Sequence, residues 1–350
     1  MRYREITFSD AINEALRESM RKDPKVLCYG LGVTDPKAVF NTTSGLEEEF
    51  GNERVFDIPC SENGITGIAI GAALRGYRSV LTHQRLDFAL LSMDQIVNSA
   101  AKWHYMFGSQ RPVPITIRMI LGRGWGQGPT HSQNLQSWFA HIPGLKVVVP
   151  SNPHDAKGLL IASIFDPNPV IFLEHRWLHN SVRSIPEGYF ETKIGTPKTV
   201  REGSDCTLVA NSYMVPECLN AAKILSEEYG IQTEIIDLNT VRPLAMEGIE
   251  KSAKKTKNLL VVDSGLSSFS ISSEIVSRLA LAQNDLTIGK LALHDISEPT
   301  SQALIKEYHN NSDDIVVRLL DMLGLGSKKF KKRRINEQKD IPGNWFRGPF

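Results

Sequence analysis

The sequence predicts an α/β protein with two domains, each a three-layer α/β/α unit in which helices cover both faces of a mostly parallel sheet. At 350 residues the chain is longer than an average single domain. Short apolar stretches, typical of buried strands, alternate with helical stretches along most of the chain. This alternation stops at residues 185–199, which contain two prolines and two glycines. We interpret that segment as a linker or a small hairpin.

The first domain is expected at residues 1–190 and begins with a capped amphipathic helix. Thr7 precedes the helical pattern of residues 9–16, and a buried strand is predicted next at 26–30. Glycines and alanines in residues 64–74 are spaced so that a helix can lie against another backbone. Further strands of this domain are predicted at residues 55–58, 79–82, 115–121, 146–149 and 170–174.

The second domain is expected at residues 200–325, because the alternation resumes there. A strand at 205–210 precedes a helix at 215–229, and further strands are predicted at 233–237 and 259–263. Residues 326–350 then form a basic tail, in which six of the seven residues at 328–334 are lysine or arginine. We interpret the tail as a solvated, flexible extension that folds partly against its own complex through Trp345, Phe346 and Phe350. The alternative is a patch for an anionic partner.

Composition limits the function classes. The formal net charge is +1, so no global field would recruit nucleic acid or a membrane surface, and we expect neither as a partner. The four cysteines have neither metal-binding spacing nor the density of a secreted disulfide framework. The N-terminal residues contain no hydrophobic export segment, and no apolar run is long enough to span a membrane. We expect a cytoplasmic protein.

Glu62 is the most informative residue, because it joins a predicted strand end to the small-residue helix. Near a helix N-terminus the dipole favours an anion, so a helix-capping acid is the simplest interpretation. Other motifs point to chemistry. The ordered set Ser61-Glu-Asn-Gly-Ile65, Met93-Asp-Gln-Ile-Val-Asn98, Gly128-Pro-Thr-His131-Ser-Gln133 and Asn168-Pro-Val-Ile-Phe-Leu-Glu174 resembles the β subunit of thiamin-diphosphate-dependent 2-oxoacid dehydrogenases, the E1 component. The resemblance extends from Ile6 to about Leu323.

The resemblance implies roles for three residues. Glu62 matches the glutamate that hydrogen-bonds the aminopyrimidine ring of the cofactor and makes its 4′ nitrogen the base that activates the thiazolium carbon. His131 matches a histidine at the mouth of the site, which assists proton steps or acyl transfer to a lipoyl group. Phe88 matches an aromatic residue that lies against the pyrimidine. A lone histidine or a core phenylalanine would otherwise be structural.

The sequence departs from this family around Phe88. Where relatives have a Thr-Phe-Asn-Phe type stretch, this chain has Arg85, Leu86 and Asp87 before Phe88. Arg85 and Asp87 are expected either to face a polar group of an unusual substrate or to be exposed on the surface. If Phe88 is instead a core residue, it would lie on a helix that continues to Asn98.

The resemblance also predicts a cation site and partners. Oxygen-rich loops suit hard cations, and a potassium site is predicted at Ile115, Ser163, Ile164, Asp166 and Asn168, with a proline-stiffened turn as the alternative. The Gly-Asp-Gly motif that holds Mg²⁺ and the diphosphate in this family is absent. An α subunit is therefore expected to hold Mg²⁺ and to share thiamin diphosphate in an α2β2 assembly with β–β contacts, which serves a lipoyl-bearing E2 acyltransferase. The alternatives are half of a split transketolase or a scaffolding subunit without catalysis.

Overall fold

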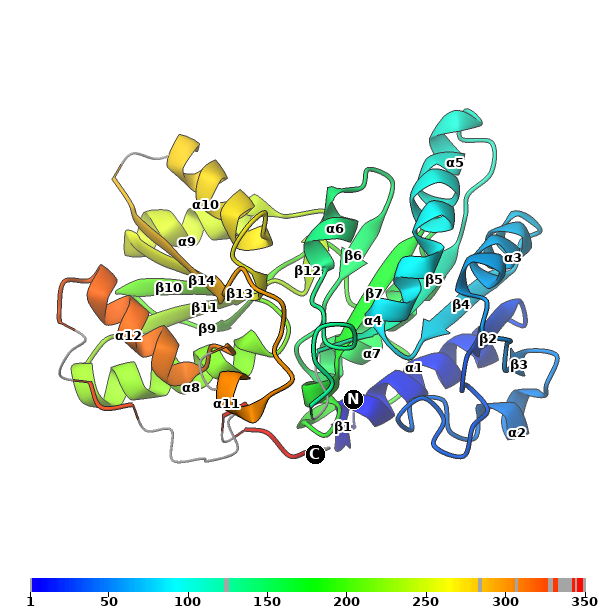
Figure 1. Cartoon of the computed structure of the whole chain (residues 1–350), viewed down its shortest axis with the longest axis horizontal. Helices are drawn as coiled ribbons and strands as arrows, with labels where there is room; N and C mark the ends of the chain where they lie inside the picture. The colour runs from blue at the N-terminus through cyan, green and yellow to red at the C-terminus, as the bar shows by residue number, and fades with distance from the viewer. Residues whose placement is uncertain are drawn as a thin grey trace.

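Two α/β domains lie side by side in the computed structural model (Figure 1). The structure describes residues 2–122, 126–282, 285–305, 308–326, 330–332, 342–343 and 345–348. The larger domain is built on a seven-stranded sheet. Its strands lie in the order β12 (Thr240–Arg242), β6 (Lys146–Val148), β7 (Val170–His175), β5 (Ile115–Leu121), β4 (Arg78–His83), β2 (Val26–Gly30) and β3 (Val55–Phe56).

The smaller domain contains a five-stranded sheet. All its pairings are parallel except that between β9 and β11. A separate two-stranded sheet joins β1 (Tyr3–Thr7) to β8 (Val182–Pro186). The five strands lie in the order β14 (Thr287–Leu293), β13 (Asn258–Leu266), β10 (Cys206–Ala210), β11 (Thr233–Asp237) and β9 (Lys198–Arg201).

Helices cover both faces of each sheet, as the sequence predicts. The first helix begins after Thr7, whose side chain accepts a hydrogen bond from the Asp10 amide at 3.1 Å. The helices of the larger domain are α1 (Phe8–Lys22), α2 (Leu46–Phe50), α3 (Glu62–Leu74), α4 (Leu86–Ala89), α5 (Ala101–Met106), α6 (Gln136–His141) and α7 (Pro153–Phe165). Those of the smaller domain are α8 (Met214–Tyr229), α9 (Met246–Thr256), α10 (Ile271–Ala282), α11 (Gln302–Ile305) and α12 (Ser312–Met322).

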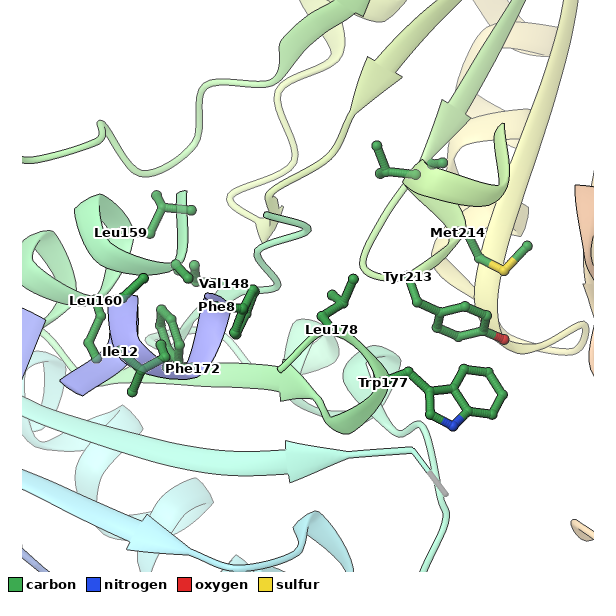
Figure 2. Close-up of a cluster of buried hydrophobic side chains, with 14 of the residues drawn as sticks. Phe8, Ile12, Val148, Leu159, Leu160, Phe172, Trp177, Leu178, Tyr213 and Met214 are labelled. Atoms are coloured by element: carbon green, nitrogen blue, oxygen red, sulfur yellow. The ribbon is translucent and has the colours of Figure 1, made fainter. Parts of the chain in front are cut away.

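Successive side chains of the strands enter two different apolar layers, because side chains alternate across a strand. Phe172 of β7 belongs to the same apolar layer as residues of α1 and α7, whereas its neighbour Ile171 belongs to the opposite layer, which includes residues of α3. Leu208 and Val209 of β10 divide in the same way between the same two layers. Each apolar layer therefore continues from one domain into the other. Figure 2 shows part of one layer.

The chain crosses between the domains in ways that the sequence did not predict. Residues 185–199 form no hairpin with themselves, because β8 pairs with β1 and β9 pairs with β11. The strand β12 follows β11 in sequence but pairs with β6 of the larger domain. In Figure 1 the described part of the tail returns toward the N-terminus. No helix within the described ranges is long and apolar enough to cross a membrane.

Candidate active site

Glu62 is the first residue of α3, and five residues separate it from the end of the short strand β3. Its side chain is half-buried, and among the described residues its carboxylate contacts the Cys60 thiol, with 3.8 Å from Sγ to Oε1. The preceding residue Ser61 makes no side-chain capping bond. Among the described residues the Glu62 carboxylate accepts no capping hydrogen bond, so a structural role at the start of α3 would rest on the helix dipole alone.

A shallow pocket brings Glu62 and Phe88 together at the carboxyl ends of strands. Ligands commonly bind at this edge of an open α/β sheet. The walls are partly apolar, and the single acid among the lining residues is Glu62. The pocket is lined by Leu31, Ile58, Pro59, Cys60, Ser61, Glu62, His83, Gln84 and Phe88.

His83 is a site residue that sequence reasoning left unassigned. It ends β4, its side chain is buried, and burial lowers its pKa to about 4. The imidazole is therefore neutral at physiological pH. Its Nε2 atom has no hydrogen-bond partner among the described residues. The position of His83 at the carboxyl end of a parallel strand is the signal that could have identified it.

His131 lies beside the pocket and not in its wall. Its ring meets Phe88 edge to face, with 5.4 Å between the ring centroids, and its Nδ1 is 3.0 Å from the Thr130 hydroxyl. Phe88 is half-buried, so it is not simply a core residue. The three residues predicted for catalysis and cofactor binding thus form one continuous arrangement in which Phe88 lies in the pocket with Glu62 and contacts His131.

The backbone after Phe88 is not one continuous α-helix. The α-helix α4 is followed by a 3₁₀ turn at Leu90–Ser92 and a π-helix at Gln95–Ala100. Such irregular turns often occur near functional sites, because they redirect side chains. The helical segment therefore continues past Asn98, as predicted, but its hydrogen-bonding pattern changes along the way.

Arg85 and Asp87 make contacts that the sequence did not predict. Arg85 is 5% exposed and donates a hydrogen bond from Nη1 to the Gly122 carbonyl at 2.7 Å. Asp87 accepts one from Gln133 Nε2 at 2.8 Å. Surface exposure is therefore wrong for Arg85, and both side chains bind the loop that carries His131.

Residues 122–128 form a glycine-rich loop after β5, and positions 123–125 of this loop lie outside the described residues. Gly122 has φ +75°, and a Cβ there would overlap the His175 ring, so only glycine suits this position. Thr300 of the smaller domain lies against Gly128. The loop is thus packed between the two domains.

Comparisons with known proteins agree with this geometry. Residues 4–181 match the family "Transketolase, pyrimidine binding domain", and residues 195–315 match "Transketolase, C-terminal domain". The chain is 40% identical over 336 residues to the acetoin:2,6-dichlorophenolindophenol oxidoreductase subunit beta of Bacillus subtilis (strain 168), covering 92% of this chain and 98% of that protein. The chain belongs to the family of E1 β subunits. This E1 β subunit is also 39% identical to the human mitochondrial pyruvate dehydrogenase E1 component subunit beta, covering 79% of this chain and 77% of that protein.

A solved structure shares the fold of this E1 β subunit. It is described as "Split gene transketolase, inactive beta4 tetramer", with a TM-score of 0.75, 20% sequence identity, and coverage of 91% of this chain and 99% of that chain. At this identity the likeness shows the fold alone. The two-domain α/β prediction is confirmed as a transketolase-like fold.

The loop predicted to bind potassium in this E1 β subunit already carries two basic contacts. The Ile164 carbonyl accepts a hydrogen bond from Arg78 Nη1 at 3.1 Å, and the Asp166 carboxylate pairs with Lys146. The Asn168 amide donates to Asp166 Oδ1 at 2.9 Å. Ser163 and Ile164 end α7, and Ile115 begins β5 next to β7, so the five residues are brought near one another. The Ile164 carbonyl oxygen has a second lone pair that the Arg78 contact does not use. The potassium site therefore stays a prediction.

Proposed function

We propose that this chain is the β subunit of a thiamin-diphosphate-dependent 2-oxoacid dehydrogenase, which decarboxylates a 2-oxoacid and passes the acyl group to a lipoyl-bearing E2. The observation that carries the proposal is the arrangement of Glu62 and Phe88 in one pocket, with Phe88 in contact with His131. Identities of 36 to 40% to E1 β subunits, against 20% to the transketolase structure, favour this function over half of a split transketolase.

The lining residues of the pocket, whose free volume in the single chain is about 10 Å³, have the chemistry to contact the aminopyrimidine end of the cofactor. Apolar walls suit a flat ring, Phe88 would lie against that ring, and the Glu62 carboxyl would hydrogen-bond a ring nitrogen. Thiamin diphosphate, when bound, supplies a carbon nucleophile for attack on the substrate carbonyl. The described lining residues offer no cation for the diphosphate, because His83 is neutral. This supports a split site in which an α subunit holds the diphosphate and Mg²⁺.

His131 would act at the mouth of this site. An imidazole can donate or accept a proton near neutral pH, which suits protonation steps or the transfer of an acyl group to a dihydrolipoyl thiol. The edge contact with Phe88 fixes the ring beside the pocket, and the Thr130 hydroxyl can fix its tautomer. We assign His131 to acyl transfer and Glu62 to cofactor activation.

Reconstitution tests the proposal. The chain is purified with an α-type subunit that carries the Gly-Asp-Gly motif, and carbon dioxide release is measured with pyruvate and with branched-chain 2-oxoacids. Acetoin is included as a substrate because the name of the Bacillus subtilis relative contains it. We expect an α2β2 complex that acylates a lipoyl domain from at least one 2-oxoacid. Transfer of a two-carbon ketol unit between sugars would instead identify a split transketolase, and a complex without any activity would identify a scaffolding subunit.

A further inference from the structure

Two charged side chains from the start of α4 bind the loop that carries His131 on both sides of that residue. We call residues 126–134 the His131 loop. Before His131, the Arg85 guanidinium donates to the Gly122 carbonyl at 2.7 Å and to the side-chain oxygen of Gln127. After His131, Asp87 Oδ1 accepts hydrogen bonds from Gln133, at 2.8 Å from Nε2 and 3.4 Å from the backbone amide.

The same short helix supplies the surface on which the His131 ring lies. Phe88 directly follows Asp87 and meets the His131 ring at 5.4 Å, at nearly a right angle. The backbone at α4 therefore sets the position of the Phe88 ring relative to the Arg85 and Asp87 side chains. No helix or strand is formed in residues 126–134, so regular backbone hydrogen bonds do not hold the loop. The contacts with Arg85 and Asp87 restrict it, together with the packing of Thr300 against Gly128.

Arg85 is suited to this role because it is buried and still charged. Burial lowers its pKa, while the carboxylates of Asp87 and Glu298 raise it, and an arginine remains protonated at neutral pH. A buried guanidinium that lost its acceptors would be an unpaired charge, so the Arg85 contacts hold the loop firmly. Glu298 belongs to the smaller domain, so both domains contribute to the charge balance around this side chain.

We propose that Arg85 and Asp87 are positioning residues that hold the His131 ring against Phe88 at the mouth of the site. The inference deepens the proposed function and rests on it for its catalytic consequence. It predicts that loss of either tether releases the His131 loop and impairs the step that uses His131, while the Glu62 pocket stays intact. A displacement of about 1 Å of a catalytic group can reduce a rate by roughly a hundredfold.

The first measurement reports the position of the ring without any catalysis. Histidine is isotopically labelled in the assembled complex, and His131→Gln assigns the His131 ring signal in the NMR spectrum. In the wild type the Phe88 ring current should displace that signal from the position of an unstructured histidine. Asp87→Ala and Arg85→Gln should remove the displacement. Asp87→Asn should retain it, because the amide oxygen still accepts from Gln133.

Matched variants separate positioning from a general loss of fold. Gln133→Ala removes the Asp87 contact from the other side and should move the His131 signal as Asp87→Ala does, and the double variant should add little to either. Asp285→Asn and Arg318→Gln change exposed residues far from the loop and should leave the signal unchanged. If the signal keeps its position in both Asp87→Ala and Arg85→Gln, the inference is overturned. The inference would also be overturned if the His131 signal had the same position in Asp87→Asn as in Asp87→Ala.

The second measurement uses single turnovers of the assembled complex. Acyl transfer to a lipoyl domain should fall about ten- to a hundredfold in Asp87→Ala and Arg85→Gln, while decarboxylation and the KM for the 2-oxoacid stay within about twofold. Asp87→Asn should restore most of the transfer rate. An equal fall in decarboxylation and transfer would contradict the positioning role. If the wild-type complex acts on no 2-oxoacid, the proposed function fails, and the NMR measurement still decides whether Arg85 and Asp87 position His131.

Discussion

The Glu62 carboxyl is half-buried, although a carboxyl group that directs proton chemistry in a cofactor works best away from water. In the single chain, water can still reach Glu62 from the open side of its pocket. A partner surface that covers this side would remove water from Glu62 and strengthen its hydrogen bond to the cofactor ring. At the scale of the residue, we therefore predict that activation of the cofactor depends on assembly.

We predict that Glu62→Gln leaves the assembled complex folded and reduces its activity at least a hundredfold. The amide has nearly the same shape as the carboxylate but lacks the charge that favours the required tautomer of the aminopyrimidine. The measurement is proton exchange at the thiazolium C2 carbon in the reconstituted complex. Exchange at the wild-type rate in this variant would remove Glu62 from the mechanism, and the thermal midpoint of the complex serves as the control for folding.

His131→Ala should affect a later step than Glu62→Gln does. The residue contacts Phe88 outside the wall of the pocket, so acyl transfer should fall about tenfold or more while C2 exchange continues. Single-turnover assays with a lipoyl domain separate the two steps. Unchanged decarboxylation together with unchanged acylation would show that His131 has only a structural role.

The sequence could predict that Glu62, Phe88 and His131 lie near one another, because Glu62 and His131 lie within short family motifs and Phe88 matches a family position. The roles of Arg85 and Asp87 could not be predicted, because their partners Gly122 and Gln133 are 37 and 46 residues away along the chain. No local pattern reports such pairings. His83 was missed although it directly follows the predicted strand at residues 79–82, because its place in the pocket depends on the neighbouring strands.

At the scale of the element, apolar runs rich in branched residues predicted the central strands well. The predicted strand at residues 115–121 coincides with β5, and the one at 26–30 coincides with β2. Prediction failed for β8, β9 and β12, which are short and lie at sheet edges. Their partners are distant in sequence, so their conformation is set by tertiary pairing and not by local propensity.

Asp237 at the end of β11 should make stability depend on pH. Its pKa is raised to about 7, chiefly by burial and also by Asp155, while Ser151, Lys198 and Arg183 oppose the rise. Between pH 4 and 7 the folded state therefore binds a proton that the unfolded state has lost, so the free energy of unfolding falls as pH rises through this range. Asp237→Asn should flatten this dependence in urea titrations at several pH values. The exposed Asp285→Asn should not, and an unchanged slope in Asp237→Asn would refute the assignment.

At the scale of the whole molecule, the described part of the tail connects the two domains. Trp345 Nε1 and the Gly343 amide donate to Glu217 Oε1 of α8, at 2.8 and 2.7 Å. The ring of Phe346 lies 6.5 Å from that of Trp177, which also packs against Tyr213 at the junction of the domains (Figure 2). Trp345 and Phe346 thus fold against the protein itself, as the sequence predicted, whereas Phe350 lies outside the described residues.

We predict that Trp345→Ala lowers the free energy of unfolding by about 2 kcal/mol, since it removes apolar contact and a donor to the buried Glu217. Trp345→Phe keeps the apolar contact and should cost about 1 kcal/mol. Chemical unfolding of the assembled complex measures both. Equal stability of the wild type and Trp345→Ala would show that the tail contributes nothing to the junction.

The last prediction concerns the division of the cofactor between chains. The single chain offers the aminopyrimidine a pocket with one carboxylate and a neutral histidine, and the described lining residues provide no positive charge for a diphosphate. Alone, it should therefore bind thiamin and thiamin diphosphate equally weakly, with a Kd of roughly 1 mM or higher. Calorimetry should show a preference for the diphosphate form, dependent on Mg²⁺, only when an α-type subunit is added. Tight Mg²⁺-dependent binding by this chain without a partner would contradict the split site, because the whole of the diphosphate site would then have to lie within these 350 residues.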